Sequence, residues 1–172
     1  VPEVAGQEES EPTSSEPVAP TQEVIQPDPA DPVDNIDPEM AEIFLEEGED
    51  ILEASGVHLE HWIAANDASD LPALQRQLHT LKGGARMCGA QTIGTLSHEL
   101  EYIYEGLING KYKRSPALVT LIQQSHDQLQ TMLDDLKQGG AISSAAGILR
   151  KLRCFRSTGT VSDERISEPK GA

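Results

Sequence analysis

The sequence predicts an all-α protein, an antiparallel up-down four-helix bundle with a short extra C-terminal helix and disordered tails. Apolar residues recur at three- and four-residue intervals through residues 38–156, which is the period of an amphipathic helix. No stretch alternates apolar and polar residues with period two over a useful length, so strands are not expected. Four helices joined by short connections favour an antiparallel bundle.

The two ends of the chain differ in composition from its middle. Residues 1–37 hold ten acidic residues and seven prolines, with no Lys or Arg. Such a stretch buries too little apolar surface to offset the entropy lost when it becomes ordered. We therefore expect residues 1–37 to be a disordered acidic linker, residues 38–156 to be the folded domain, and residues 157–172 to be a second, flexible linker.

Start and stop signals divide the first half of the domain into two helices. The sequence Asp-Pro-Glu at 37–39 combines an N-cap acid, Pro at the first helical position and an acidic first turn. The stretch 66–70 (NDASD) ends this helix, and a second helix begins near Asp70 and ends at Gly89. The apolar positions of the two helices are Met40, Phe44, Ile51, Leu52, Leu59 and Trp62, then Leu71, Leu74, Leu78, Leu81 and Ala85.

Three further helices are expected in the second half of the domain. The third stops near the Asn-Gly pair at 109–110, and Ser-Pro at 115–116 starts a fourth that ends at the Gly-Gly pair 139–140. Residues 141–155 can form a short fifth helix. The apolar positions of the third and fourth helices are Ile93, Leu96, Leu100, Ile103 and Leu107, then Leu118, Leu121, Ile122, Leu129, Met132, Leu133 and Leu136.

Composition excludes several classes of function. The 172-residue chain has 13 basic and 29 acidic residues, and a net charge of −16 argues against binding to nucleic acid or to anionic membranes. No apolar run approaches the roughly 18 residues that span a bilayer, and no signal-peptide pattern opens the chain. Cys88 and Cys154 match no metal-binding or disulfide spacing. We expect a cytoplasmic, monomeric piece of a longer protein, with Cys88 as a packing residue.

One face of the second helix carries an unusual set of residues. At 100° per residue, His79 lies about 140° from the centre of the leucine stripe, so its side chain should be exposed. Residues pointing within about 60° of His79 are Gln75, Lys82, Gly83 and Arg86. The pair Gly83-Gly84 costs about 1 kcal/mol per Gly in a helix interior. Open access to the imidazole is one compensating gain, and a close helix–helix contact is the alternative.

Residues 79–90 (HTLKGGARMCGA) closely resemble the histidine phosphotransfer (HPt) signature, His-x-x-Lys-Gly followed by Gly six residues later. The resemblance is strongest to the phosphotransfer domains of CheA-type chemotaxis kinases, in which a second His and a Glu follow on the next helix. Here the matching stretch is 96–101 (LSHELE), and the resemblance covers about residues 38–155. Residues 83–87 (GGARM) also resemble the phosphotransfer domains of pilus-associated chemosensory kinases. The family is built on an antiparallel four-helix bundle.

The resemblance implies that His79 accepts a phosphoryl group from an ATP-bound histidine kinase domain and passes it to an aspartate of a response regulator receiver domain. A carboxylate that accepts the Nδ1–H of an imidazole leaves Nε2 free as the nucleophile. Glu101 is the candidate for this role, and His98, on the same flank, could join the hydrogen-bond network. Lys82 would offset the phosphoryl charge. The expected docking residues for partner proteins are Gln75, Gly83, Gly84 and Arg86.

The sequence carries no phosphate-binding loop or other nucleotide motif. We therefore expect no catalysis and no cofactor in this chain alone, with ATP and Mg²⁺ used by a kinase domain elsewhere. One alternative is an adaptor bundle that acts without phosphorylation. Another is a metal-binding bundle built on His79, His98 and Glu101. His58 and His61 have i, i+3 spacing, but the sequence places neither Cys nor an obvious acid pair beside them, so no metal site is expected there.

Overall fold

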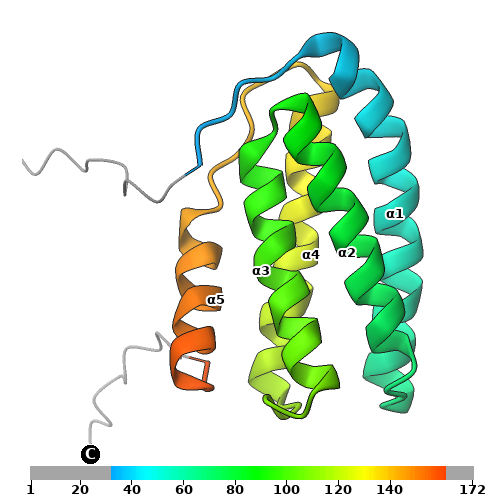
Figure 1. Ribbon diagram of the computed structural model, residues 1–172, viewed down its shortest axis with the longest axis vertical. Helices are drawn as coiled ribbons and strands as arrows, with labels where there is room; N and C mark the ends of the chain where they lie inside the picture. The colour runs from blue at the N-terminus through cyan, green and yellow to red at the C-terminus, as the bar shows by residue number, and fades with distance from the viewer. Residues whose placement is uncertain (1–31, 162–172) are drawn as a thin grey trace, which may run out of the picture. The chain divides into compact units, whose positions relative to one another are not determined.

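The computed structural model describes residues 32–161, which form five helices and no strand (Figure 1). The predicted all-α class is confirmed, whereas most of the two predicted linkers (1–31 and 162–172) lies outside the described residues. No helix in the described range is long and apolar enough to cross a membrane. The helices are α1 (Pro38–Ala65), α2 (Asp70–Cys88), α3 (Gln91–Ile108), α4 (Pro116–Lys137) and α5 (Ala146–Thr158).

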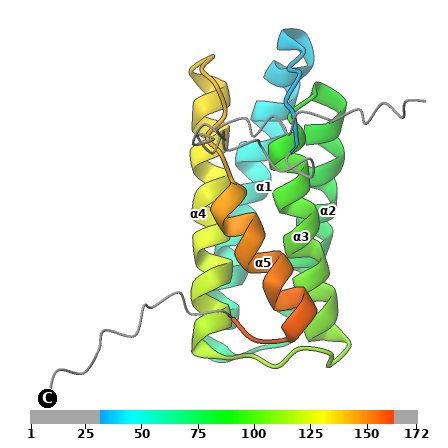
Figure 2. The ribbon, with the colours of Figure 1, turned by 90° about the vertical axis from the view of Figure 1, so that its left-hand side faces the viewer.

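The four longer helices lie side by side around one apolar core (Figures 1 and 2). Helices α1 and α3 each contact both α2 and α4, and α5 packs against α3 and α4. The periodic apolar positions of α2 are all buried, and Leu74, Leu78 and Leu81 are completely inaccessible to solvent. This burial fixes the rotation of α2 and leaves its opposite face to the solvent.

Helix boundaries follow the capping signals. The Asp37 carboxylate accepts a hydrogen bond from the Glu39 amide at 3.1 Å, and the Ser115 hydroxyl accepts one from the Leu118 amide at 3.1 Å. Helix α5 differs from the expectation, because it begins at Ala146 and extends to Thr158, past the predicted domain boundary. The Asp135 carboxylate on α4 accepts hydrogen bonds from the amide and hydroxyl of Ser143, which holds the start of that segment outside the helix.

The six residues before α1 also belong to the folded unit. We call residues 32–37 the leading segment. Its backbone donates two hydrogen bonds to the connection between α2 and α3, from Asn35 to the Gly89 carbonyl and from Asp37 to the Cys88 carbonyl, both at 2.9 Å. The Asp34 carboxylate accepts from the amide and hydroxyl of Thr92, at 2.9 and 2.8 Å, and so caps α3. The structured part of the chain therefore begins before Pro38.

We expect Gly89→Ala to lower the free energy of unfolding by at least about 2 kcal/mol. Gly89 has a φ of +84°, and a Cβ added there would lie 1.7 Å from the Asn35 carbonyl oxygen. The substitution thus imposes a left-handed conformation on Ala and expels the leading segment. Gly110→Ala is the control, because Gly110 also has a positive φ but nothing within 4 Å of an added Cβ. Equal losses for the two variants in urea unfolding would show that the leading segment contributes nothing.

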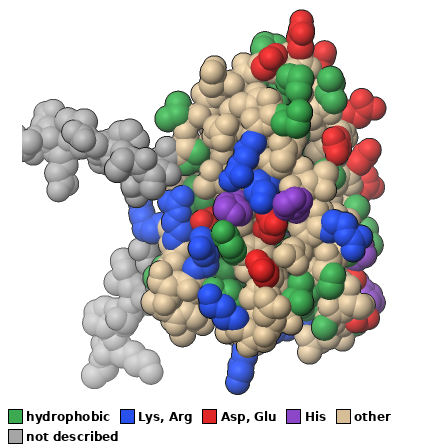
Figure 3. All heavy atoms as spheres, in the orientation of Figure 1, with side chains coloured by type: hydrophobic (Ala, Val, Ile, Leu, Met, Phe, Trp, Pro, Cys, Tyr) green, Lys and Arg blue, Asp and Glu red, His purple; other side chains and the backbone are tan. Residues whose placement is uncertain are grey.

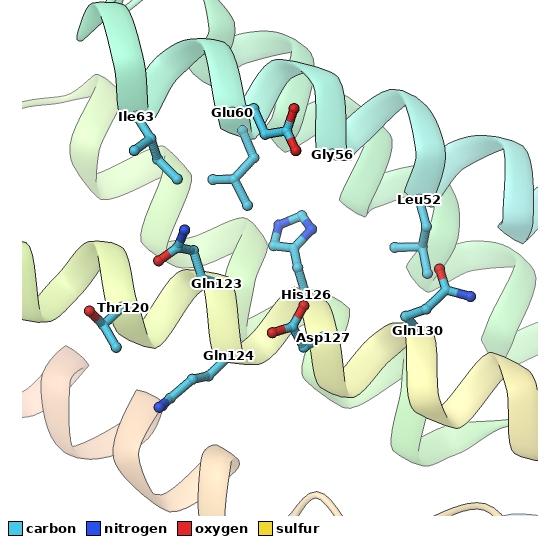
Figure 4. Close-up of a pocket in the computed structure, with 11 residues that line it drawn as sticks. Leu52, Gly56, Glu60, Ile63, Thr120, Gln123, Gln124, His126, Asp127 and Gln130 are labelled. Carbon is cyan, nitrogen blue, oxygen red and sulfur yellow. The ribbon is translucent and has the colours of Figure 1, made fainter.

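A groove of about 500 Å³ lies between α1 and α4 (Figure 4). His126 projects from α4 into this space and is almost fully buried, with its Nε2 atom 2.7 Å from the Tyr104 hydroxyl. Burial lowers the pKa of His126 from its ordinary value of 6.5 to about 4. The imidazole is therefore neutral in the folded protein at pH 7.

This buried imidazole makes stability depend on pH. The unfolded chain protonates His126 near pH 6.5, whereas the folded chain does so only near pH 4. The stabilisation that comes from keeping His126 neutral is complete above pH 6.5. As the pH falls to 4, the free energy of unfolding decreases by about 3 kcal/mol for this reason. His126→Gln can keep a hydrogen bond to Tyr104 but does not titrate. Urea unfolding between pH 7 and 4 should therefore give a shallower decline for the variant, and identical slopes would contradict this assignment.

Candidate functional site

His79 stands on the solvent-facing side of α2. Its side chain is 66% exposed, whereas the neighbouring Leu78 is buried. The structure thus confirms the prediction from helical periodicity that the His79 side chain is exposed. Two histidine side chains flank an acidic side chain on the face formed by α2 and α3, with basic side chains beside them (Figure 3).

The carboxylate of Glu101 on α3 connects His79 with Lys82. Its Oε1 atom lies 2.8 Å from Nδ1 of His79, and its Oε2 atom accepts a hydrogen bond from Nζ of Lys82 at 2.7 Å. Glu101 and Lys82 are each only 14% exposed. Each carboxylate oxygen therefore has one partner from α2, which fixes the plane of the carboxylate beside the imidazole.

The protonation state of this group follows from its surroundings. Burial raises the pKa of the Glu101 carboxyl, but hydrogen bonds from Lys82 and His79 outweigh burial and leave the pKa below its usual value. An ionised carboxylate can only accept hydrogen bonds, so Nδ1 of His79 carries the proton that Glu101 receives. In the neutral imidazole, Nε2 then keeps its lone pair and is the nucleophilic atom.

Lys82 has a partner that the sequence did not predict. Its ammonium pairs with the Glu101 carboxylate, and its role in offsetting the charge of a phosphoryl group stays a prediction. This pairing keeps Glu101 ionised and holds it in place. Lys82 is one helical turn from His79, so its charge also lies close to any group bound to the imidazole.

His98 lies beside the network without joining it. In the part of the chain that the structure describes, it has no hydrogen bond to His79 or Glu101, and its ring contacts the Tyr102 ring at a tilt of 39°, with centroids 4.5 Å apart. Burial, reinforced by the charges of Lys82 and Arg86, lowers the pKa of His98. The ring lies against Tyr102 on its own helix, and the hydrogen bonds of the expected network stop at Glu101.

The two adjacent glycines of α2 face different surroundings. A Cβ added at Gly83 would have nothing within 4 Å, whereas one added at Gly84 would lie 2.9 Å from the Phe44 ring on α1. The close helix–helix contact left open by the sequence therefore accounts for Gly84. Gln75, Gly83 and Arg86 remain the predicted docking residues.

Met87 is an exposed residue that sequence reasoning missed. It lies one turn beyond Gly83, and 73% of it is accessible to solvent. Met87 could have been recognised from the sequence, because it is an apolar residue that lies outside the buried stripe of α2. Flexible methionines are common at protein-binding surfaces.

The metal-binding alternative at this site is not supported. Within the described chain, the ligand atoms of His79, His98 and Glu101 do not converge on a common position. Cys88 is buried, and burial raises the pKa of its thiol, which fits the expected packing role.

If His79 is the phosphoacceptor that the sequence predicts, we expect Glu101→Gln to slow its phosphorylation by roughly ten- to a hundredfold, the range for loss of a partner that orients a histidine. The amide is uncharged and can present an N–H to the imidazole, so it no longer enforces the tautomer with the proton on Nδ1. Long-range ¹H–¹⁵N spectra of the imidazole measure that tautomer directly.

Glu99→Gln is the matched control for Glu101→Gln. Glu99 is a buried acid of α3, and its carboxylate accepts hydrogen bonds from Arg156 on α5, at 2.7 and 3.0 Å. The control should leave the His79 tautomer unchanged. If Glu101→Gln also leaves the tautomer and the rate unchanged, the carboxylate does not set the state of His79.

Comparison of the chain with known proteins identifies its family. The family model described as "Hpt domain" matches residues 39–139. The chain is similar to "Chemotaxis protein CheA" of Listeria monocytogenes, with 28% identity over 102 residues, and of Klebsiella aerogenes, with 30% identity over 95 residues. These matches cover 59% and 55% of this chain but only 16% and 15% of the relatives.

A solved structure supports the same fold. It is described as the phosphorylated P1 domain of CheA3 in complex with CheY6 from R. sphaeroides, and it aligns with a TM-score of 0.63 and 20% identity. The alignment covers 72% of this chain and all of that chain. Because the family model spans more than half of the sequence and includes both α2 and α3, this protein belongs to the Hpt domain family.

Proposed function

We propose that this Hpt domain is the phosphotransfer module of a chemosensory two-component system. His79 receives a phosphoryl group from ATP bound to a histidine kinase domain and delivers it to an aspartate of a response regulator receiver domain. The observation that carries the proposal is the Glu101 carboxylate, which holds the Nδ1 side of an exposed imidazole. The similarity to CheA proteins supports the proposal. We further infer that α1–α4 form an antiparallel, up-down bundle.

The chemistry follows from the arrangement of this pair. The lone pair on Nε2 attacks the γ-phosphorus, an N–P bond forms, and the P–O bond to ADP breaks with its electron pair leaving on ADP. Nδ1 keeps its proton, so positive charge develops on the ring, and the Glu101 carboxylate stabilises that charge. In the second step a receiver carboxylate attacks phosphorus and the electron pair of the N–P bond returns to Nε2.

Lys82 serves both states of the site in this proposal. Before transfer, its ammonium fixes Glu101. After transfer, a phosphoryl group one turn away adds negative charge, and the ammonium can be shared between that group and Glu101. ATP and Mg²⁺ are required by the kinase partner, and this chain supplies the acceptor.

Labelling experiments distinguish a protein that only accepts a phosphoryl group from one that phosphorylates itself. The purified protein should gain no label from radioactive ATP alone but should be labelled when a CheA-type kinase domain is added. Potassium phosphoramidate, a small donor that requires no partner, should also phosphorylate it. The label should be acid-labile and alkali-stable, as phosphohistidine is, and should move to a receiver domain. Autophosphorylation of the protein alone, or no phosphohistidine from either donor, would overturn the proposal.

A further inference from the structure

A second cluster of chemically active side chains lies at the junction of α1 and α2. Two imidazoles from the last turns of α1 point to one carboxylate at the start of α2. Nδ1 of His58 lies 2.9 Å from Oδ1 of Asp70, and Nδ1 of His61 lies 2.5 Å from Oδ2. This junction is nine residues, or about 13 Å along α2, from His79. The cluster is therefore separate from the proposed phosphotransfer site.

The connection between the helices adds another carboxylate. Ligand atoms of His61, Asp67 and Asp70 all lie within 4.8 Å of one another. Zn²⁺ binds imidazole nitrogen and carboxylate oxygen at about 2.0–2.2 Å, so two ligand atoms on one tetrahedral ion lie roughly 3.4 Å apart. Adjustments of about 1 Å convert the present spacing into that geometry.

The exposure of these side chains suits an ion that enters from solvent. Asp70 is only 9% exposed and provides a fixed point, whereas His61 is 54% exposed and His58 is 38% exposed. The two imidazoles can therefore move by the small distance that an ion requires. Asp67 lies in the short connection, where its carboxylate accepts a hydrogen bond from the Ser69 amide at 2.9 Å.

The charges of the cluster favour a cation. Hydrogen bonds from His58 and then His61 lower the pKa of the Asp70 carboxyl, and Asp70 in turn raises the pKa of His61. Asp70 therefore presents an ionised carboxylate to both imidazoles. A divalent transition-metal ion binds imidazole nitrogen and carboxylate oxygen together.

We propose that His61, Asp67 and Asp70 bind a divalent transition-metal ion of the Zn²⁺ class, with His58 beside them through its contact with Asp70. The ion would join the last turn of α1 to the first turn of α2. The sequence showed no obvious acid pair beside the two histidines, whereas in the structure Asp67 from the connection and Asp70 from the start of α2 supply that pair.

Titration of the full chain with ZnCl₂ tests the proposal. Calorimetry should detect one site, and the imidazole NMR signals of His58 and His61 should shift while those of His79 and His98 do not. Asp67→Asn can keep the hydrogen bond to Ser69 but replaces a carboxylate ligand, and His61→Ala removes an imidazole. Each should weaken Zn²⁺ binding by at least about tenfold. Circular dichroism checks that both variants remain helical.

The matched control is His79→Gln, which removes a histidine of similar exposure outside the cluster. It should bind Zn²⁺ as the unmodified protein does, and MgCl₂ should produce no shifts because Mg²⁺ prefers oxygen ligands. Absence of Zn²⁺ binding by the unmodified protein, or unchanged affinity in His61→Ala and Asp67→Asn, would overturn the proposal and leave the cluster as a hydrogen-bonded helix junction. Loss of binding in His79→Gln would overturn it as well, because the ion would then belong to the other site.

Discussion

His79→Gln should receive no phosphoryl group from a CheA-type kinase domain or from phosphoramidate, while its free energy of unfolding changes by less than about 0.5 kcal/mol. The side chain is two-thirds exposed and fills no core space. A Gln amide can still donate a hydrogen bond to Glu101, but its nitrogen has no lone pair available for attack on phosphorus. Radiolabelling measures the first effect and urea unfolding measures the second.

His98→Gln is the control for the acceptor. In the described chain His98 contacts Tyr102 rather than Glu101, so its loss should leave labelling within a few-fold of the unmodified rate. If label persists in His79→Gln and maps to His98 by mass spectrometry, the acceptor assignment is wrong.

Gly83→Leu should slow transfer to a receiver domain by roughly a hundredfold, the scale at which a displaced reactive group loses its geometry. The new side chain would project about 40° from His79 and one turn along α2, on the face that a partner must approach. Nothing lies within 4 Å of a Cβ at this position, so the fold has room for it. Helix propensity should raise the free energy of unfolding by a few tenths to about 1 kcal/mol.

Gly56→Leu provides the matched control for this substitution. Gly56 is also a glycine within a helix with nothing within 4 Å of an added Cβ, but it lies on α1 and lines the groove near His126. The control should gain similar helix propensity and transfer at the unmodified rate. Wild-type transfer by Gly83→Leu would instead show that this surface is not where the receiver docks.

Helices could be predicted from the sequence because their signals are local. The cap at Asp37 and the stop at Gly89 depend on residues within a few positions, and each is found where it was predicted. The start of α5 could not be predicted, because an Asp135 side chain on another helix holds Ser143 outside it. Helical periodicity assigns directions to side chains but does not report what lies opposite them.

The same distinction applies to the candidate site. Angles along one helix place His79 on an open face, but they cannot separate Gly83, which faces solvent, from Gly84, which faces Phe44. The pairing of Glu101 with His79 was expected from the family pattern rather than from spacing, since 22 residues separate them. The junction of Asp70 with His58 and His61 depends on the path of a turn, which composition does not encode.

The leading segment determines where mechanical load would enter the fold. A pull on the chain at residue 32 acts first on the hydrogen bonds from Asn35 to Gly89 and from Asp34 to Thr92, and reaches the first turn of α1 only after these have broken. Tension is therefore carried by the joint between α2 and α3. Gly89 follows His79 by ten residues, so a pull on the N-terminal side of the domain reaches α2 about 15 Å along the helix from the imidazole.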